Sequence, residues 1–266
     1  MRLEGKVAVI TGAGQGIGEA TAERMVEEGA KVVVSDVNAE TGEAVAQKLR
    51  DQGGEAQFVA ADVSSVADVK ALMAATKEAF GRLDILHNNA GVHETGFTSA
   101  ARSDELDEEI WDKVVAINLK GVWMCSKYAA PLLAEAGGGA IVSAASIGGL
   151  LGYPMGAAYG PSKAGVIQLT RGMALELADQ GTRVNCYSPG NTDTPMVQKY
   201  YMESGSEEEQ EMIKQQLLGT HMFDRMPVPR EVANLVVFLA GDEASMITGT
   251  NVVIDVGTTA WRGMRS

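Results

Sequence analysis

Short apolar runs alternate with amphipathic segments along the first third of this chain. The apolar runs are Val7–Ile10, Lys31–Ser35, Gln57–Ala60 and Ile85–Asn88, and they predict strands, the first of them too continuously apolar to have one exposed face. The segments between them, residues 17–28, 39–52 and 66–80, have the periodicity of helices. Because parallel neighbours need a crossover connection, this alternation predicts an α/β fold in which helices cover both faces of a parallel sheet.

The alternation continues through the rest of the chain. Further strands are predicted at residues 140–143, 183–187 and 251–256, and further helices at residues 106–136, 155–179 and 231–239. Neither a repeat nor a linker interrupts them. The whole chain, residues 1–266, is therefore predicted to form one doubly wound domain.

One segment departs from the alternation. Residues 195–218 are polar and irregular, and they follow the predicted sixth strand. We therefore expect residues 195–222 to form a mobile lid over a substrate. The acidic run Glu207–Glu209 within it is expected to be the solvated face of a helix.

Composition narrows the classes of partner. The formal net charge of −13 disfavours nucleic acid and anionic membranes, which would repel the chain. Cys125 and Cys186 are the only cysteines, which suits buried thiols in a reducing cytosol. No Cys or His spacing suits zinc, no apolar run is long enough to span a bilayer, and the first strand begins too early for a signal peptide. These features predict a cytoplasmic protein with a small-molecule partner and no metal.

A glycine-rich turn connects the first predicted strand to the first helix. It contains Gly12, Gly16 and Gly18, whose spacing is a variant of the G-x-G-x-x-G arrangement. The helix N-terminus behind such a turn can hold a pyrophosphate. Asp36 ends the second strand about 20 residues further on, where a carboxylate can accept both hydroxyls of an adenosine ribose. It would repel a 2′-phosphate, and neither Gln15 nor Val37 offers a positive charge, so NAD is predicted over NADP. A capping role for Asp36 is the alternative, and both roles can coexist.

Polar residues also follow the remaining strands. Asp62 ends the third strand, where it can meet an adenine amino group or close a turn, and Asn88–Gly91 end the fourth. Ser146 follows the fifth strand and Pro189–Gly190 the sixth. Ligands of an open parallel sheet bind at the carboxyl ends of its strands, so these residues are predicted to share one rim with the glycine turn.

Tyr159 and Lys163 are four residues apart in the predicted helix 155–179, which places them one turn apart on the same face. A lysine ammonium beside a phenol favours the phenolate, and such a tyrosine can exchange a proton with an alcohol or ketone near neutral pH. Taken alone, the two residues also suit an ordinary surface pair.

Together, these motifs resemble the short-chain dehydrogenase/reductase family over essentially the whole chain. In the family's order they are Thr11–Gly18, Asn88–Gly91, Asn118, Ser146, Tyr159-x-x-x-Lys163 and Pro189–Gly190. The resemblance implies a Rossmann-like sheet of seven strands in the order 3-2-1-4-5-6-7. It implies that Tyr159 is the general acid and base, that Ser146 orients the carbonyl, and that Lys163 binds the nicotinamide ribose and lowers the tyrosine pKa. It also implies that Asn118 holds a water that joins Lys163 to solvent.

The resemblance further implies which residues hold the ligands. The residues expected to bind NAD are Gly12, Gln15, Gly16, Ile17, Gly18, Asp36, Val37, Asp62, Val63, Asn89, Ala90, Gly91, Tyr159, Lys163, Pro189, Gly190, Thr192 and Thr194. Those expected to face the substrate are His93, Glu94, Gly148, Tyr153, Asn191, Met196 and Tyr200. Their mixture of apolar and polar side chains leaves a cyclic hydroxy compound, a sugar alcohol and a steroid-like ketone open.

Three places depart from the family's usual pattern. Pro161 lies early in the predicted helix and lacks an N–H, which can widen or kink the pocket. His87 stands where an aliphatic residue is usual, and we interpret it as a core or rim histidine. Asn191 and Thr192 stand where apolar residues are common, and we expect them to contact the carboxamide or a polar substrate.

The function predicted is NAD-dependent interconversion of a secondary alcohol and a ketone. An NADPH-dependent 3-oxoacyl reductase shares the fold and residues, but Asp36 and the lack of an evident basic docking patch argue against it. A non-catalytic NAD-sensing module is the second alternative, although Asn118, Ser146, Tyr159 and Lys163 are all present. The family is commonly homotetrameric through helices 106–136 and 155–179, so a homotetramer is expected.

Overall fold

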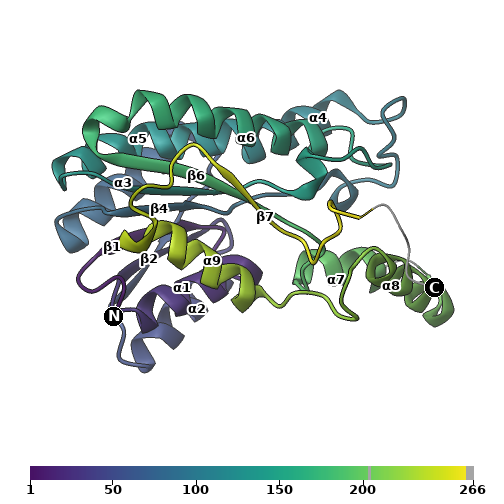
Figure 1. Cartoon of the computed structure of the whole chain (residues 1–266), viewed down its shortest axis with the longest axis horizontal. Coiled ribbons are helices and arrows are strands. Elements are labelled where there is room, and N and C mark those ends of the chain that lie inside the picture. Colours follow the sequence, from purple (N-terminus) through teal and green to yellow (C-terminus); the bar gives the residue numbers. More distant parts are fainter. Residues whose placement is uncertain (203–204, 262–266) are drawn as a thin grey trace.

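Seven parallel strands form one sheet in the order β3-β2-β1-β4-β5-β6-β7 (Figure 1). The computed structural model describes residues 1–202 and 205–261, with the backbone alone for residues 200–202. The strands are β1 (Val7–Thr11), β2 (Lys31–Asp36), β3 (Ala56–Ala60), β4 (Ile85–Asn88), β5 (Gly139–Ala144), β6 (Thr182–Pro189) and β7 (Asn251–Ile254). The predicted doubly wound sheet and its strand order are confirmed.

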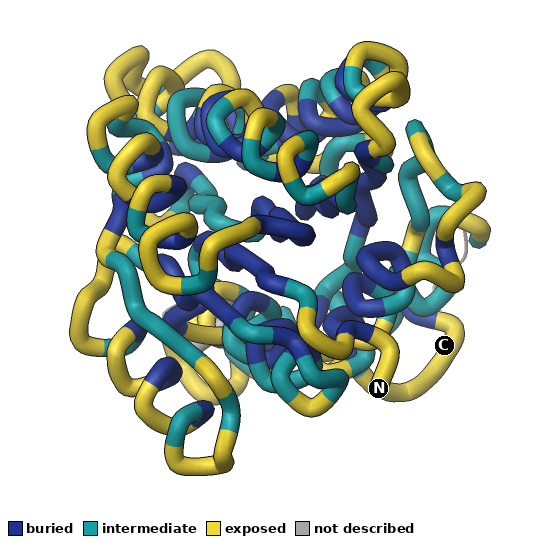
Figure 2. Tube along the Cα trace, turned by 90° about the vertical axis from the view of Figure 1, so that its left-hand side faces the viewer, coloured by how far each residue is buried: buried dark blue, intermediate teal, exposed yellow. Residues whose placement is uncertain are grey.

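Helices cover both faces of the sheet. On one face lie α1 (Gly16–Glu27), α2 (Ala39–Asp51) and α9 (Pro229–Ala240), and on the other lie α3 (Val66–Phe80), α4 (Glu108–Val115), α5 (Val122–Glu135) and α6 (Tyr159–Glu176) (Figure 1). Successive residues of a strand point to opposite faces of the sheet, and each face has its own core. Ile10 packs in the core beneath α1 and α9, and Val9 packs in the core beneath α3 and α5. The buried strands therefore lie at the centre, and the outward turns of the helices are exposed (Figure 2).

The predicted helix 106–136 is interrupted by a π-helical turn. This turn, Ala116–Gly121, separates α4 from α5 and contains the buried Asn118. A π-turn widens the helix locally and is frequent at functional sites.

The predicted helix 155–179 begins later than expected, at Tyr159. Met155 has a φ of 62°, in the left-handed region, which a right-handed helix excludes. The later start places Pro161 in the first turn of α6, where its missing N–H removes no intrahelical bond. α6 continues unbroken to Glu176, so the expected disturbance at Pro161 is absent.

The expectation of irregular backbone at residues 195–218 is wrong, because this segment forms α7 (Pro195–Met202) and α8 (Glu207–Gly219). Pro195 begins α7, at a position that proline favours. Ser206 and Glu209 form a capping box that begins α8. The acidic run forms the exposed first turn of α8, where negative charge interacts favourably with the helix dipole.

Candidate active site

The carboxyl ends of the strands open onto one cavity of about 560 Å³. Of the residues predicted to bind NAD, those that line it are Gly12, Gln15, Gly16, Ile17, Asp36, Val37, Asp62, Val63, Asn89, Ala90, Gly91, Tyr159, Lys163, Pro189 and Thr194. Gly190 and Thr192 line an adjoining cavity of about 420 Å³. Small strand-end residues such as Ala61, Ala144 and Ala145 also line the first cavity, although no sequence motif marks them.

The glycine turn brings β1, α1 and the end of β4 into close contact. Gly12 has a φ of 62°, and a Cβ on it would lie 2.7 Å from the Cα of Ala90. Gly18 lies outside the cavity lining, and a Cβ on it would lie 2.2 Å from the carbonyl oxygen of Gly12. Gly18 therefore acts through packing, by letting α1 approach the turn. Gln15 makes no side-chain cap, which leaves the first N–H groups of α1 available to an anion such as a pyrophosphate.

Asp36 accepts hydrogen bonds from two backbone N–H groups; it does not cap α2, whose N-cap is Asn38, and its binding of a ribose stays a prediction. Its Oδ2 accepts a hydrogen bond from Gly14 N at 2.9 Å, and its Oδ1 accepts one from Asn38 N at 2.9 Å. These bonds fix the carboxylate at the rim of the cavity, beside Val37, whose side chain is 73% exposed. In the described part of the chain, neither lysine of the cavity lining pairs with Asp36: Lys113 lies over Phe97, and Lys163 donates to Ala144 O. The rim thus suits a ribose with free hydroxyls.

Asp62 lines the cavity and also closes a turn. Its Oδ1 accepts hydrogen bonds from the backbone N and the hydroxyl of Ser64, at 2.8 and 2.7 Å. Ser65, not Asp62, caps α3. A dinucleotide fits the donor set of this cavity: free N–H groups of α1 lie at the glycine turn, and Asp36 and Asp62 at the ends of β2 and β3.

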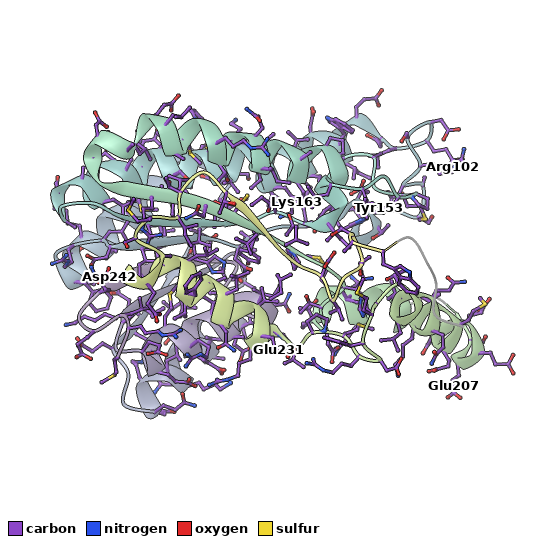
Figure 3. All side chains as sticks on the ribbon, in the orientation of Figure 1. Arg102, Tyr153, Lys163, Glu207, Glu231 and Asp242 are labelled. Atoms are coloured by element: carbon purple, nitrogen blue, oxygen red, sulfur yellow. The ribbon has the colours of Figure 1, made fainter. Side chains whose placement is uncertain are left out.

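Tyr159 is the first residue of α6, and Lys163 lies one turn further on. The Lys163 Nζ lies 5.6 Å from the centroid of the Tyr159 ring and donates a hydrogen bond to Ala144 O at 2.8 Å. Figure 3 shows Lys163 beneath α6 and Tyr153 nearer the loops at the end of the sheet. Ser146 precedes a 3₁₀ turn, Ile147–Gly149, and its Oγ accepts a hydrogen bond from Gly148 N.

Burial dominates the ionisation of this pair. It raises the pKa of the Tyr159 phenol, a hydrogen bond with Ser146 opposes the rise, and the charge of Glu94 adds to it. Burial also lowers the pKa of Lys163 to about 8. The lowering of the tyrosine pKa by Lys163 stays a prediction; in this structure the ammonium is bonded to a backbone carbonyl.

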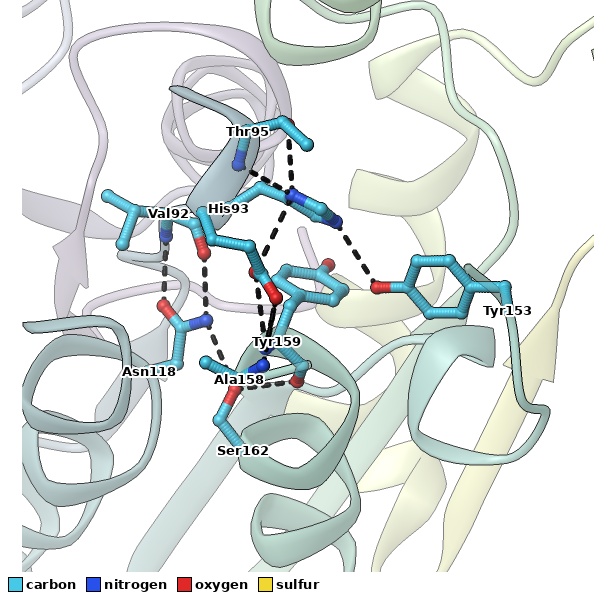
Figure 4. Close-up of polar contacts among 9 residues, drawn as sticks. Val92, His93, Thr95, Asn118, Tyr153, Ala158, Tyr159 and Ser162 are labelled. Carbon is cyan, nitrogen blue, oxygen red and sulfur yellow. Dashed lines mark hydrogen bonds and ion pairs between the residues drawn. The ribbon is translucent and has the colours of Figure 1, made fainter. Parts of the chain in front are cut away.

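Asn118 ties the loop after β4 to α6. Its Nδ2 donates to Val92 O at 2.8 Å and to Ser162 Oγ at 3.2 Å, and its Oδ1 accepts from Val92 N at 2.8 Å (Figure 4). A Cβ on Gly91 would lie 3.3 Å from Lys163 Nζ and 3.4 Å from Asn118 Oδ1, so both side chains reach the same point. The proton relay through a water held by Asn118 stays a prediction.

The adjoining cavity receives most of the residues expected to face the substrate. These are His93, Gly148, Tyr153, Asn191 and Met196, together with Ser146 and Tyr159. The side chain of Tyr200 lies outside the described residues. Leu217 and Thr220 of the 195–222 segment and Thr258 after β7 also line it, and nothing in their sequence surroundings marks them as pocket residues.

Glu94 does not line either cavity, contrary to expectation. It is fully buried, and its carboxylate accepts hydrogen bonds from Ala158 N and Tyr159 N. The contact joins residues that are 64 positions apart, so local sequence gives no sign of it.

His93 packs against Tyr159. Its ring centroid is 4.7 Å from that of Tyr159, and its Nε2 lies 3.2 Å from the Tyr153 hydroxyl. Its Nδ1 accepts a hydrogen bond from Thr95 N. A backbone N–H can only donate, so Nδ1 is unprotonated and Nε2 carries the proton. Burial lowers the pKa of His93 more than the charge of Glu94 raises it, so the ring is neutral.

His87 is a core histidine, as interpreted. It is fully buried, and its Nε2 lies 3.0 Å from the Tyr187 hydroxyl. Burial lowers the pKa of His87 to about 3, so the ring is neutral.

Two features are absent from the described residues, 1–202 and 205–261. None of their helices is long and apolar enough to cross a membrane. They also contain no group of three or more His, Cys, Asp or Glu side chains placed to hold a metal ion.

Comparison with known proteins agrees with this geometry. The family model described as enoyl-(acyl carrier protein) reductase matches residues 12–259. The cis-4-hydroxycyclohexanecarboxylate dehydrogenase of Sinomonas cyclohexanicum is 42% identical over 96% of this chain and 97% of that protein. The cyclohexanol dehydrogenase of Acinetobacter sp. (strain SE19) is 38% identical over 97% of each chain.

A 3-oxoacyl-[acyl-carrier-protein] reductase of Thermotoga maritima is also similar, with 36% identity over 97% of this chain and 99% of that protein. Among solved structures, the crystal structure of levodione reductase matches with a TM-score of 0.89 and 35% identity, over 98% of this chain and 100% of the other.

Proposed function

This chain belongs to the short-chain dehydrogenase/reductase family, and we propose that it is an NAD-dependent dehydrogenase that interconverts a neutral secondary alcohol and its ketone. One observation carries the proposal. Tyr159 lines two cavities at once, one that ends at the Asp36 carboxylate and one with an uncharged described lining. A residue shared in this way can exchange a proton with a substrate that lies beside a cofactor.

The preference for NAD rests on Asp36. A carboxylate fixed by Gly14 N and Asn38 N is ready to accept the two hydroxyls of an adenosine ribose. The same carboxylate would repel a 2′-phosphate.

The proposed roles of the catalytic residues are those that the family resemblance implies, and their positions are compatible with them. A bound nicotinamide supplies the hydride acceptor for oxidation and the hydride donor for reduction. Tyr159 takes the hydroxyl proton of the alcohol onto its phenolate oxygen in oxidation and returns it to the ketone oxygen in reduction. Ser146 bonds to the same oxygen and orients it, and Lys163 holds the nicotinamide ribose.

The substrate is proposed to be neutral and cyclic. The described lining of the 420 Å³ cavity contains no Asp, Glu, Lys or Arg, and its one histidine is neutral. A substrate carboxylate there would lose part of its hydration without gaining a counter-charge, which weakens its binding. Two relatives are named for cyclohexane alcohols, which favours a ring of that size; one of these alcohols carries a carboxylate, so the relatives support the ring and not its neutral charge.

A matched pair of substrates tests this proposal. Cyclohexanol and cis-4-hydroxycyclohexanecarboxylate differ by one carboxylate. We expect NADH formation from the neutral alcohol with a kcat/KM at least about tenfold higher, which is about 1.4 kcal/mol. A clear preference for the acid would overturn the neutral class, and the absence of turnover across a broad alcohol and ketone panel would overturn the enzyme.

A 3-oxoacyl reductase is the main alternative, because the similar Thermotoga maritima protein is named as one. Such an enzyme usually uses NADPH and acts on a substrate bound to an acyl carrier protein. Tighter binding of NADPH than of NADH, together with reduction of a 3-oxoacyl thioester, would favour it. NADH binding without any turnover would instead favour a non-catalytic sensor.

We also propose that residues 195–222 close over the substrate. α8 contains no fully buried residue, so little apolar surface opposes its movement.

We further propose that the chain forms a homotetramer. Trp111 of α4 and Trp123 of α5 are 39% and 43% exposed, which suits helices that meet a second subunit.

A further inference from the structure

Glu94 is a carboxylate with no exposed surface. Its Oε1 accepts a hydrogen bond from Ala158 N at 2.8 Å, and its Oε2 accepts one from Tyr159 N at 3.2 Å (Figure 4). Its one ion-pair partner in the described chain is His93, whose Nδ1 lies 3.6 Å from Oε2. Because that nitrogen is unprotonated, the N-terminus of α6 is what balances the buried charge.

This contact supplies a cap that α6 lacks locally. The residue at the N-cap position, Ala158, has no side-chain oxygen. Glu94 reaches the two N–H groups from a different loop, and one of them belongs to Tyr159 itself. The position of the catalytic tyrosine therefore depends on a residue far away in the sequence.

The loop that carries Glu94 also forms a wall of the substrate cavity. His93 and Thr95, its direct neighbours, line that cavity. Asn118 bonds both backbone groups of Val92 and also Ser162, whose hydroxyl donates to Tyr159 O at 2.7 Å. The loop and the first turn of α6 are thus joined at both ends of the Val92–Glu94 segment.

We propose that Glu94 is a positioning residue for the dehydrogenase reaction, which fixes the first turn of α6, and with it Tyr159, to the loop that forms the substrate wall. The inference rests on the proposed function, because it assigns a role in that reaction. The contact does not merely stabilise a helix end, since the charge of Glu94 also acts on the reacting phenol.

The charged and titratable groups around Tyr159 make this electrostatic role specific. Lys163 of α6, Tyr187 of β6 and His93 lie around it. Tyr153 lines the same cavity and contacts His93. Tyr187 is kept neutral by burial, which raises its pKa, and His93 is neutral. Burial is the main cause that raises the pKa of Tyr159, and the negative charge of Glu94 adds to the rise. Removal of that charge should therefore favour the phenolate at lower pH.

Two substitutions separate position from charge. Glu94→Gln keeps the length and one acceptor but removes the charge, so the midpoint of the rise of kcat/KM with pH in alcohol oxidation should move to lower pH by about 0.5 unit or more. Glu94→Asp keeps the charge but withdraws it from α6, so kcat should fall about tenfold while KM and the pH midpoint change little. The control is Asp107→Asn, which likewise removes the charge of a capping carboxylate, at α4, and keeps one acceptor, so it should change neither quantity.

A simple structural cap predicts a different result. Both Glu94 variants would then lose thermal stability, and the pH midpoint would stay within about 0.2 unit of the wild type. That result, or wild-type behaviour of both variants, would overturn the proposal.

A second measurement does not need turnover. The tyrosinate absorbance of each protein, minus that of its Tyr159→Phe counterpart, follows the ionisation of Tyr159 alone. We expect the difference titration to move to lower pH in Glu94→Gln and not in Asp107→Asn. If the wild type oxidises no alcohol, the proposed function fails, and an unmoved titration would separately refute the role of Glu94.

Discussion

Replacing Asp36 by asparagine and Val37 by arginine should move the cofactor preference from NAD to NADP. Gly14 N and Asn38 N now bond to different oxygens of the carboxylate, at 2.9 Å each. The asparagine keeps an amide oxygen for one of these two backbone donors, and the other loses its acceptor. The arginine replaces a side chain that is 73% exposed, so it can reach the rim of the cavity without displacing the core.

The expected difference in binding free energy between NADH and NADPH follows from the charges of Asp36 and the 2′-phosphate. A phosphate monoester carries a charge of about −1.5 to −2 at pH 7. Two unit charges about 4 Å apart interact by about 1 kcal/mol in bulk water and about 4 kcal/mol near a protein surface. Repulsion by Asp36 should therefore weaken NADPH binding by at least about 2 kcal/mol, or about 30-fold, relative to NADH. The double variant should remove this difference or reverse it.

The assay is calorimetric titration of the wild type, both single variants and the double variant with NADH and NADPH. Val253→Arg on β7, which replaces a 40% exposed valine by the same cation, controls for added positive charge. Equal or tighter binding of NADPH by the wild type would refute the argument from Asp36, as would a double variant with an unchanged affinity ratio.

Two further predictions concern packing and pH. Gly18→Ala places a Cβ 2.2 Å from Gly12 O, so it should destabilise the fold by about 1–3 kcal/mol and weaken NADH binding. Gly172→Ala, whose Cβ meets nothing within 4 Å, is the control and should have neither effect. Urea unfolding measures the stability of each variant, and calorimetric titration measures its affinity for NADH. The pKa of His87 is about 3 in the folded protein and 6.5 in the unfolded chain. Between these values the unfolded state binds a proton that the folded state does not, so the free energy of unfolding decreases as the pH falls from 6.5 towards 3. The loss at pH 5 is about 2 kcal/mol, and it should disappear in the double variant His87→Leu, Tyr187→Phe; an equal fall between pH 7 and pH 5 in both proteins would contradict this.

The strands and most of the rim were predictable from sequence because the information is local. Four β-branched or apolar runs and the spacing of helices determine a parallel sheet, and the carboxyl ends of its strands then bring Asp36, Asp62 and Asn89 to one edge. The capping box of Ser206 and Glu209 is equally local, and recognising it would have predicted the helix that begins at Glu207.

The start of α6 and the role of Glu94 were not predictable in this way. Met155 to Ala158 continue a helical pattern, and only the left-handed backbone of Met155 and the distant carboxylate of Glu94 define where the helix begins. The π-turn around Asn118 has the same origin, since its side chain bonds to Val92, 26 residues earlier. Tertiary contacts decide these features, and periodicity does not contain them.

The central claim is that Tyr159 moves the proton in an NAD-dependent oxidation. The direct measurement is NADH formation from a secondary alcohol by the wild type and by Tyr159→Phe, with the Kd of NADH measured for both. We expect kcat to fall by about 10²- to 10⁴-fold while the Kd changes less than about threefold. Near-normal turnover by Tyr159→Phe would contradict the assignment.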